Sequence, residues 1–441
     1  MNLPPSRGAA LAALEAALPV SGKPGQDLQA ALNSHLPRLG DPRDKALATE
    51  LCYGYARLKG RMEHLARLYL QKPNKTHPYV LRVLGLAAYE LTGLDSIPAH
   101  ATLSWAVEAV KERLGQAQAG VANAVLRRIQ ELGARANDRA LYRDTSKDPA
   151  LTLSAWHSCP EWIVRMWLDE YGAKTAEAML EAQSAPPLTG VRVNKGKQGA
   201  RELFDELAAR FAPVWSGYPW LGFDQSSAPS LSEIEALEKE GRLTRQSPAV
   251  GDIMRRLGAA DWLRPVWDAC AGRGGKTTAL LEMACAAGKG SEGAAVWASD
   301  VNMRRLRGLR GEASRLGLPL PELFLAGGAN PPLKARPATI LLDAPCSGLG
   351  VLARRPDAKW KRSPGDVSTL AAIQSGLLRA CAEVLPRGGG LVYMTCTMTL
   401  AENEAQAALI ESLGFVRKAV TNPDAGSSLR EFFWGGRFVK R

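Results

Sequence analysis

The sequence predicts a multidomain chain with an all-helical bundle over residues 1–142, a small α+β module over 143–244 and a doubly wound α/β domain over 245–441. Three observations lead to this fold class. The length of 441 residues exceeds that of one ordinary domain. Apolar residues recur at helical spacing in the N-terminal part. From about residue 245, short apolar strands alternate with helices, which is typical of a mostly parallel sheet.

Five helices are expected in the N-terminal part, because five apolar stripes at helical spacing are separated by turns rich in Pro and Gly. The stripes cover Leu11–Leu18, Leu47–Leu58, Val80–Leu91, Trp105–Val110 and Val121–Ile129. This layout is typical of a compact bundle, and a bundle by itself carries no information on function.

The middle module combines helical and extended patterns. We expect helices over Glu161–Gln183, Gly199–Arg210 and Leu231–Gly241, with a strand over Gly190–Asn194. Arg192 and Asn194 on that strand are interpreted as ordinary strand residues, with a positioning role as the alternative.

Strand and helix patterns alternate through the C-terminal part. The expected strands are Pro265–Asp268, Ala295–Ala298, Glu322–Leu325, Thr339–Leu342 and Leu391–Met394. Helices are expected over Lys276–Ala287 and Asp366–Leu385, and an antiparallel hairpin over Phe415–Ala419 and Glu431–Val439.

Two cysteines each follow a predicted buried strand. Cys346 lies in the segment Asp343-Ala-Pro-Cys-Ser, and Cys396 lies between two threonines. Ligands of open α/β sheets sit beyond the carboxyl ends of the strands, so both thiols are expected to face one pocket. The basic residues after Cys346 are expected to lower its pKa. Four other cysteines are interpreted as small buried hydrophobic residues, namely Cys52, Cys159, Cys285 and Cys381.

A glycine-rich turn follows the first predicted strand of the C-terminal part. Gly272, Gly274 and Gly275 let the backbone approach a ligand, and the helix that opens at Lys276 favours its polar groups. The spacing matches neither a Walker A loop nor GxGxxG. Asp300 ends the next strand, where a carboxylate can accept both ribose hydroxyls of a nucleoside cofactor. The alternative is a tight turn with Asp300 as a helix cap.

The net charge of +12 favours a polyanionic partner, with a merely soluble basic surface as the alternative. The local pattern favours RNA, because cations crowd around Trp360, as a stacked base and its phosphates require. These cations are Arg354, Arg355, Lys359, Lys361 and Arg362. The run Arg304–Arg310 is either a second RNA contact or the solvated face of a helix.

Several function classes are excluded by composition. The seven cysteines are scattered and odd in number, which fits a reducing cytoplasm. All five histidines lie at or before His157, so the C-terminal half has none for zinc or for a Ser-His triad. No apolar stretch is long enough to cross a membrane, and the N-terminus does not resemble a secretion signal. We therefore expect a cytoplasmic monomer with no metal and no membrane partner.

Several motifs in this order resemble the RNA cytosine-5 methyltransferases of the Nop/Sun family. They are DACAGRGGKT, WASD, LLDAPCSGLG, RRPDAKW, and LVYMTCT followed by Glu402-Asn403-Glu404. The helical N-terminus, with Ala119–Arg127, is similar to the RNA-binding antiterminator NusB. The resemblance covers essentially the whole chain. It implies a NusB-like bundle, a Rossmann-like methyltransferase domain and ribosomal RNA of the small subunit as substrate.

The resemblance also implies a role for each motif residue. Cys396 would attack C6 of the cytosine, Cys346 would assist release, and Asp343 would hold the edge of the base. S-adenosylmethionine would be the methyl donor, with its ribose on Asp300. The donor would also be lined by Asp343 and by the turn residues Cys270, Ala271, Gly272, Arg273, Gly274, Gly275 and Lys276.

The chain departs from the family pattern at two places. The family turn commonly reads CAAPGGKT, whereas this chain reads Ala271-Gly272-Arg273-Gly274, with Arg273 in place of the proline. A carboxylate is expected after the third strand to contact adenine, but residues 325–330 contain none, so Asn330 or backbone groups would substitute. Transfer RNA as substrate, a noncatalytic assembly factor that binds RNA, and a DNA cytosine methyltransferase are the alternatives.

Overall fold

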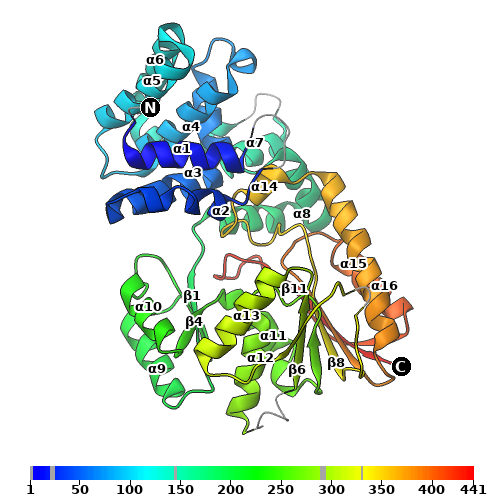
Figure 1. Cartoon of the computed structure of the whole chain (residues 1–441). Coiled ribbons are helices and arrows are strands. Elements are labelled where there is room, and N and C mark those ends of the chain that lie inside the picture. The colour runs from blue at the N-terminus through cyan, green and yellow to red at the C-terminus, as the bar shows by residue number, and fades with distance from the viewer. Residues whose placement is uncertain (1–2, 20–24, 144–146, 289–294, 329–330) are drawn as a thin grey trace. The chain divides into compact units, whose positions relative to one another are not determined.

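The computed structural model describes residues 3–19, 25–143, 147–288, 295–328 and 331–441 (Figure 1). The chain forms two compact units, one of residues 1–184 with 352–362, the other of residues 185–351 with 363–441. These units divide the chain at other places than the three predicted domains, whose boundaries stay a prediction. Within the described residues, no helix is both long and apolar enough to cross a membrane.

The first unit is helical, and its core is built from the predicted apolar stripes. Caps explain where its helices begin: the Asp41 carboxylate accepts from the amide of Arg43, and Pro42 fills the first helical position. The five predicted helices are confirmed, and α2 was missed because six residues are too few to show a period. The helices are α1 (Pro5–Ala17), α2 (Leu28–Asn33), α3 (Pro42–Leu68), α4 (Pro78–Gly93), α5 (Ala99–Leu114), α6 (Gln116–Leu132), α7 (Pro149–Trp156), α8 (Glu161–Ser184) and α14 (Ala358–Lys361).

The basic segment 352–362 packs within this first unit. The Trp360 indole donates to the carbonyl of Ala56 at 2.7 Å, and the Lys359 ammonium donates to the carbonyl of Arg57 at 2.8 Å. Lys359 is buried, and burial lowers its pKa to about 8. The prediction that Lys359 meets RNA is therefore wrong, because its buried side chain holds this segment against α3, whereas the RNA contact of the partly buried Trp360 stays a prediction.

A small antiparallel sheet opens the second unit, with the strand order β2-β3-β1-β4. Its strands are β1 (Thr189–Val193), β2 (Trp215–Gly217), β3 (Trp220–Phe223) and β4 (Leu243–Arg245), and its helices are α9 (Ala200–Phe211) and α10 (Leu231–Lys239). The sequence predicted β1 and both helices. The other strands were missed because three or four residues are too few to show alternation.

The larger sheet has seven strands in the order β10-β11-β9-β8-β5-β6-β7. The central strands pair in parallel and the last two form the predicted antiparallel hairpin, so the fold class is confirmed. The strands are β5 (Val266–Asp268), β6 (Val296–Asp300), β7 (Glu322–Leu325), β8 (Thr339–Asp343), β9 (Gly390–Thr395), β10 (Phe415–Thr421) and β11 (Trp434–Lys440).

Helices cover both faces of this sheet (Figure 1). One face packs on α11 (Pro248–Arg256), α12 (Gly275–Ala286) and α13 (Met303–Leu316). The other packs on α15 (Pro364–Val384) and α16 (Glu404–Ser412). Arg304, Arg305, Arg307 and Arg310 lie on the exposed side of α13, where either predicted role stays open.

Arg192 joins the small sheet to the glycine-rich turn. Its buried guanidinium pairs with Glu282 at 2.9 Å and donates to the carbonyl of Gly275 at 2.7 Å. Asn194 is also buried and donates to the carbonyls of Gly241 and Leu316. The interpretation of these two as ordinary strand residues is wrong, because Arg192 fixes β1 to α12 at the glycine-rich turn and Asn194 fixes it to the end of α13.

We expect Arg192→Met to lower the free energy of unfolding of the second unit by about 3–5 kcal/mol, because Glu282 would be left as a buried unpaired charge. The matched control is Arg201→Met, which breaks an exposed ion pair with Asp205 and should leave the urea midpoint nearly unchanged, because exposed pairs contribute little to stability. Urea denaturation followed by circular dichroism measures both. Equal urea midpoints for the two variants would contradict this assignment.

Candidate active site

The two motif cysteines lie on loops that follow neighbouring strands. Strands β8 and β9 run in parallel with Asp343 opposite Met394, so both chains leave the sheet at the same edge. The Sγ atoms of Cys346 and Cys396 are 3.2 Å apart. Both residues are partly exposed and neither is in a disulfide. The prediction that the two thiols face one pocket is consistent with this contact.

A buried carboxylate holds the two cysteine loops together. Glu402 accepts from the amide of Ser347 at 2.8 Å and from its hydroxyl at 2.6 Å. The same side chain accepts from the hydroxyls of Thr397 and Thr399, and from the Gln374 amide at 3.1 Å. Residues beside each cysteine are therefore tied to one charge that has no exposure to solvent.

Asn403 and Gly350 fix the loop around Cys396. The Asn403 side chain accepts from the Thr395 hydroxyl at 2.5 Å and donates to the carbonyl of Thr397 at 3.0 Å. The amide of Gly350 donates to the carbonyl of Cys396 at 3.0 Å. A Cβ at Gly350 would lie 2.2 Å from the carbonyl oxygen of Phe432, so only glycine allows this approach.

The thiol of Cys346 is held in its protonated form. The hydrogen bond with Cys396 and burial raise its pKa well above the ordinary value, and the charge of Glu402 adds to the rise. The expectation that the basic residues after Cys346 lower its pKa is therefore wrong. Those residues pack within the first unit, and the charge that acts on the thiol is negative.

Lys276 and Asp343 form an ion pair at the same edge of the sheet. The Lys276 ammonium lies 2.5 Å from Asp343 Oδ2, and both side chains are partly exposed. Burial alone would lower the pKa of Lys276, but the Asp343 carboxylate outweighs it and raises that pKa. The ammonium also lies 5.8 Å from the centre of the Phe433 ring. A polar pair with one aromatic wall can hold the edge and the face of a planar ligand.

The glycine-rich turn and Asp300 are joined directly. The amide of Gly272 donates to Asp300 Oδ2 at 3.0 Å, and the amide of Asn302 donates to Oδ1 at 2.8 Å. The alternative of Asp300 as a helix cap is wrong, because Asn302 caps α13 by accepting from the amide of Arg304. Asp300 instead presents a nearly buried carboxylate to the turn.

Asp268 is a buried carboxyl that the sequence did not single out. Its Oδ2 accepts from the Thr277 hydroxyl at 2.7 Å, whereas its Oδ1 is buried without a hydrogen-bond partner among the described residues. Burial raises the pKa of Asp268 to about 7, and the charge of Asp343 acts in the same direction. An acidic oxygen with no partner in a buried turn is suited to a cationic or hydrogen-bonding ligand.

Comparisons with known proteins decide the family. The family "16S rRNA methyltransferase RsmB/F" matches residues 260–415, the "NusB family" matches 4–131, and the "Methyltr_RsmF/B-like, ferredoxin-like domain" matches 159–214. The probable ribosomal RNA small subunit methyltransferase B of Bacillus subtilis is 33% identical over 368 residues, 82% of this chain and 78% of the relative. The chain belongs to the RsmB/F family of rRNA methyltransferases.

A second relative agrees with this RsmB/F assignment, and two solved structures agree in fold. The ribosomal RNA small subunit methyltransferase B of Xanthomonas campestris is 30% identical, covering 87% of this chain and 83% of that relative. Among solved structures, PH0851 is similar in fold with a TM-score of 0.71 at 19% identity over 100% of both chains. NSun6 from Pyrococcus horikoshii has a TM-score of 0.53 at 22% identity, covering 64% of this chain and 98% of that one.

An RsmB/F methyltransferase uses S-adenosylmethionine, and the residues at this edge of the sheet fit that donor. A Cβ at Gly272 would meet no heavy atom within 4 Å, so open space adjoins the turn. The Asp268 and Asp300 carboxyls flank that turn, and each has an oxygen with accepting capacity left. Among the described residues, no group of His, Cys, Asp or Glu is arranged to hold a metal ion.

The sequence-predicted residues divide into two groups. The first group lies at the carboxyl edge of the sheet and consists of Asp343, Lys276, Cys346 and Cys396. The second is the pair of Gly272 and Asp300, which are joined by a hydrogen bond. Arg273 is exposed, and Asn330 lies outside the described residues. Sequence reasoning missed Glu402, Asn403 and Asp268. The triplet Glu402-Asn403-Glu404 was a signal for the first two, since only four residues separate its charged and amide residues from the second cysteine motif.

We expect Glu402→Gln to lower the pKa of Cys346, because it removes a negative charge that raises that pKa. The variant also places an NH₂ group opposite the amide and hydroxyl of Ser347, which both donate hydrogen bonds to Glu402. Because these hydrogen bonds are lost, methyl transfer should fall by about tenfold or more. Alkylation of Cys346 against pH, read by peptide mass spectrometry in a Cys396→Ser background, measures the first effect. Glu411→Gln on the exposed side of α16 is the matched control, and an unchanged alkylation midpoint in Glu402→Gln would refute the role.

Affinity for the methyl donor is expected to rise as the pH increases through about 7. Asp268 carries a raised pKa, so it is neutral below that pH and charged above it, and the charged form favours a cationic donor. Calorimetry with S-adenosylmethionine at pH 5.5 and 7.5 should show a rise of about tenfold. Asp268→Asn should bind weakly at both values. If the affinity of Asp268→Asn for S-adenosylmethionine rises by the same factor between the two pH values, a group other than Asp268 is responsible and the prediction is wrong.

Proposed function

We propose that the protein methylates C5 of a cytosine in small-subunit ribosomal RNA, with Cys396 as the nucleophile and Cys346 as the group that assists release. The observation that carries the proposal is the 3.2 Å contact between two free thiols beside the Lys276–Asp343 pair. Relatives named ribosomal RNA small subunit methyltransferase B support the substrate.

Two thiols suit this reaction because C5 of cytosine is a poor nucleophile. Addition of the Cys396 thiolate to C6 raises the electron density at C5. When bound, S-adenosylmethionine supplies an electrophilic methyl group. Once C5 carries the methyl group, a water molecule takes the C5 proton, the C5–H electron pair restores the C5=C6 double bond, and the C6–S bond breaks so that Cys396 leaves as a thiolate.

The protonation state of Cys346 suits a part in that last step. Its raised pKa keeps a proton on Sγ, and Cys396 Sγ lies within reach of it. A donated S–H stabilises the thiolate that departs from C6. The two cysteines then have distinct roles, since the first must be ionised to attack and the second must stay protonated to assist.

The Lys276–Asp343 pair suits recognition of the base. A carboxylate accepts from the N4 amino group of cytosine, whereas uracil presents an acceptor at the same place. The ammonium of Lys276 holds that carboxylate in position. Asp343 is therefore proposed to hold the edge of the base. The turn from Cys270 to Lys276, together with Asp300, is proposed to line the site of S-adenosylmethionine.

Replacing each cysteine by serine should have different results. Cys396→Ser is expected to lower methyl transfer by at least about a thousandfold, because a hydroxyl is a much weaker nucleophile than a thiolate. Cys346→Ser should accumulate a covalent RNA–protein adduct, because release is slowed. Methyl incorporation into 16S rRNA and migration on a denaturing gel measure both effects.

Cys285→Ser is the matched control, because this partly exposed thiol lies on α12 with no role in the proposal. Full activity of Cys396→Ser, or an adduct in that variant, would contradict the assignment. Bisulfite sequencing of RNA from a deletion strain identifies the target cytosine and separates ribosomal from transfer RNA.

A further inference from the structure

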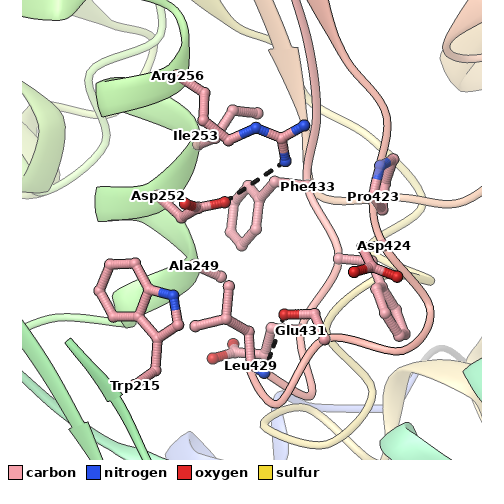
Figure 2. A pocket seen from close by; sticks show the side chains of 12 residues that line it. Trp215, Ala249, Asp252, Ile253, Arg256, Pro423, Asp424, Leu429, Glu431 and Phe433 are labelled. Atoms are coloured by element: carbon pink, nitrogen blue, oxygen red, sulfur yellow. Dashed lines mark hydrogen bonds and ion pairs between the residues drawn. The ribbon is translucent and has the colours of Figure 1, made fainter. Parts of the chain in front are cut away.

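A second cavity lies beside the proposed active site and has no role in it. Its volume is about 330 Å³, and its walls come from α11, the edge strand β2 and the segment 423–433 that leads into β11. Figure 2 shows Trp215, Phe433, Glu431 and Asp424 around this cavity. We call it the α11 pocket.

The α11 pocket shares a wall with the site of the thiols. Phe433 lines it, and the ring of Phe433 lies 5.8 Å from the Lys276 ammonium. The preceding residue, Phe432, is anchored to the loop that follows Cys346, since its amide donates to the carbonyl of Gly350 at 2.7 Å. Gly350 in turn donates to the carbonyl of Cys396. A ligand in the pocket is thus a near neighbour of one on Asp343.

The walls of the α11 pocket are held in place. Glu431 is buried and accepts from the Ser247 hydroxyl at 2.6 Å, which fixes the segment to the start of α11. Arg430 pairs with Asp224 at 2.7 Å and ties the segment to the small sheet. Trp215 and Phe433 are partly buried in the same apolar cluster. The cavity is therefore formed before any ligand enters.

The lining chemistry favours a nucleobase over a phosphate. Three carboxylates, Asp252, Asp424 and Glu431, face one guanidinium, Arg256, which already pairs with Asp252. This balance repels the RNA backbone. The aromatic rings of Trp215 and Phe433 offer stacking or edge contacts, and carboxylates accept hydrogen bonds from the amino groups on base edges.

We propose that the α11 pocket binds one unpaired base of the substrate RNA, and that this base is a close neighbour of the target cytosine along the RNA strand. The inference rests on the proposed RNA substrate and names a subsite for it. The volume lies at the lower end of ligand pockets, which suits a single base. The carboxylates select bases that carry an exocyclic amine, so adenine, guanine or cytosine is accepted and uracil is disfavoured.

The test uses a synthetic RNA hairpin that carries the cytosine found by bisulfite mapping. An abasic residue replaces each neighbouring nucleotide in turn, and kcat/KM for methyl transfer is measured. One abasic position should lower kcat/KM of the wild type by about 5- to 150-fold, the range for stacking of a base on an aromatic side chain. Trp215→Ala should lower kcat/KM by a similar factor on the intact hairpin.

Coupling between the two changes decides the outcome. If the pocket holds that base, Trp215→Ala and the abasic residue together cost no more than either alone. Multiplied losses, or no sensitive position in the wild type, would overturn the inference. If the wild-type protein does not methylate C5 of the intact hairpin, that result would instead contradict the proposed function.

A milder variant keeps the test valid if Trp215→Ala does not fold. Asp424→Asn changes one exposed carboxylate of the pocket. The wild type should prefer an amino-bearing base over uracil at the sensitive position, and Asp424→Asn should lose at least part of that preference. Asp205→Asn, an exposed carboxylate on α9, is the matched control and should keep it in full. An unchanged preference in Asp424→Asn would also overturn the inference.

Discussion

The hydrogen bonds of the Glu402 carboxylate are the constraint on which the arrangement of the two cysteines depends. A buried charge is costly unless every nearby donor turns toward it, and here donors from Ser347, Thr397, Thr399 and Gln374 all do so. Because these donors flank both cysteines, satisfying one charge brings two thiols into contact. The hydrogen bond with Cys396 and burial account for most of the rise in the pKa of Cys346, and the charge of Glu402 adds to it.

The surrounding fold brings these groups to one edge. Parallel pairing of β8 and β9 aligns their carboxyl ends, and the glycine at position 350 lets the segment before β11 lie close to Cys396. Arg192 donates to the carbonyl of Gly275 and so fixes the small sheet to the end of the glycine-rich turn. In the first unit, Trp360 and Lys359 hold a segment that a sequence pattern had assigned to RNA.

Much of the fold and part of the site could be predicted from the sequence. Long apolar stripes and strand–helix alternation are local patterns, so α3–α6 and β5–β9 were predictable. The roles of Glu402, Asp268 and Arg192 were not, because each depends on partners many residues away and on burial that a sequence does not display. For the same reason, the sequence of the basic run at 354–362 did not predict its tertiary contacts. Its charges predict contact with solvent or phosphate, while tertiary contacts bury Lys359 and partly bury Trp360.

The most direct test of the central claim is the identity of the cysteine that bonds to the base. RNA with 5-fluorocytidine at the target position cannot lose its C5 substituent as a proton, so the adduct with the wild-type protein should persist. Peptide mass spectrometry after nuclease digestion then locates the bond. We predict that it lies on Cys396 with Cys346 free. A bond to Cys346, or no adduct on RNA that the enzyme methylates in its unmodified form, would contradict the account.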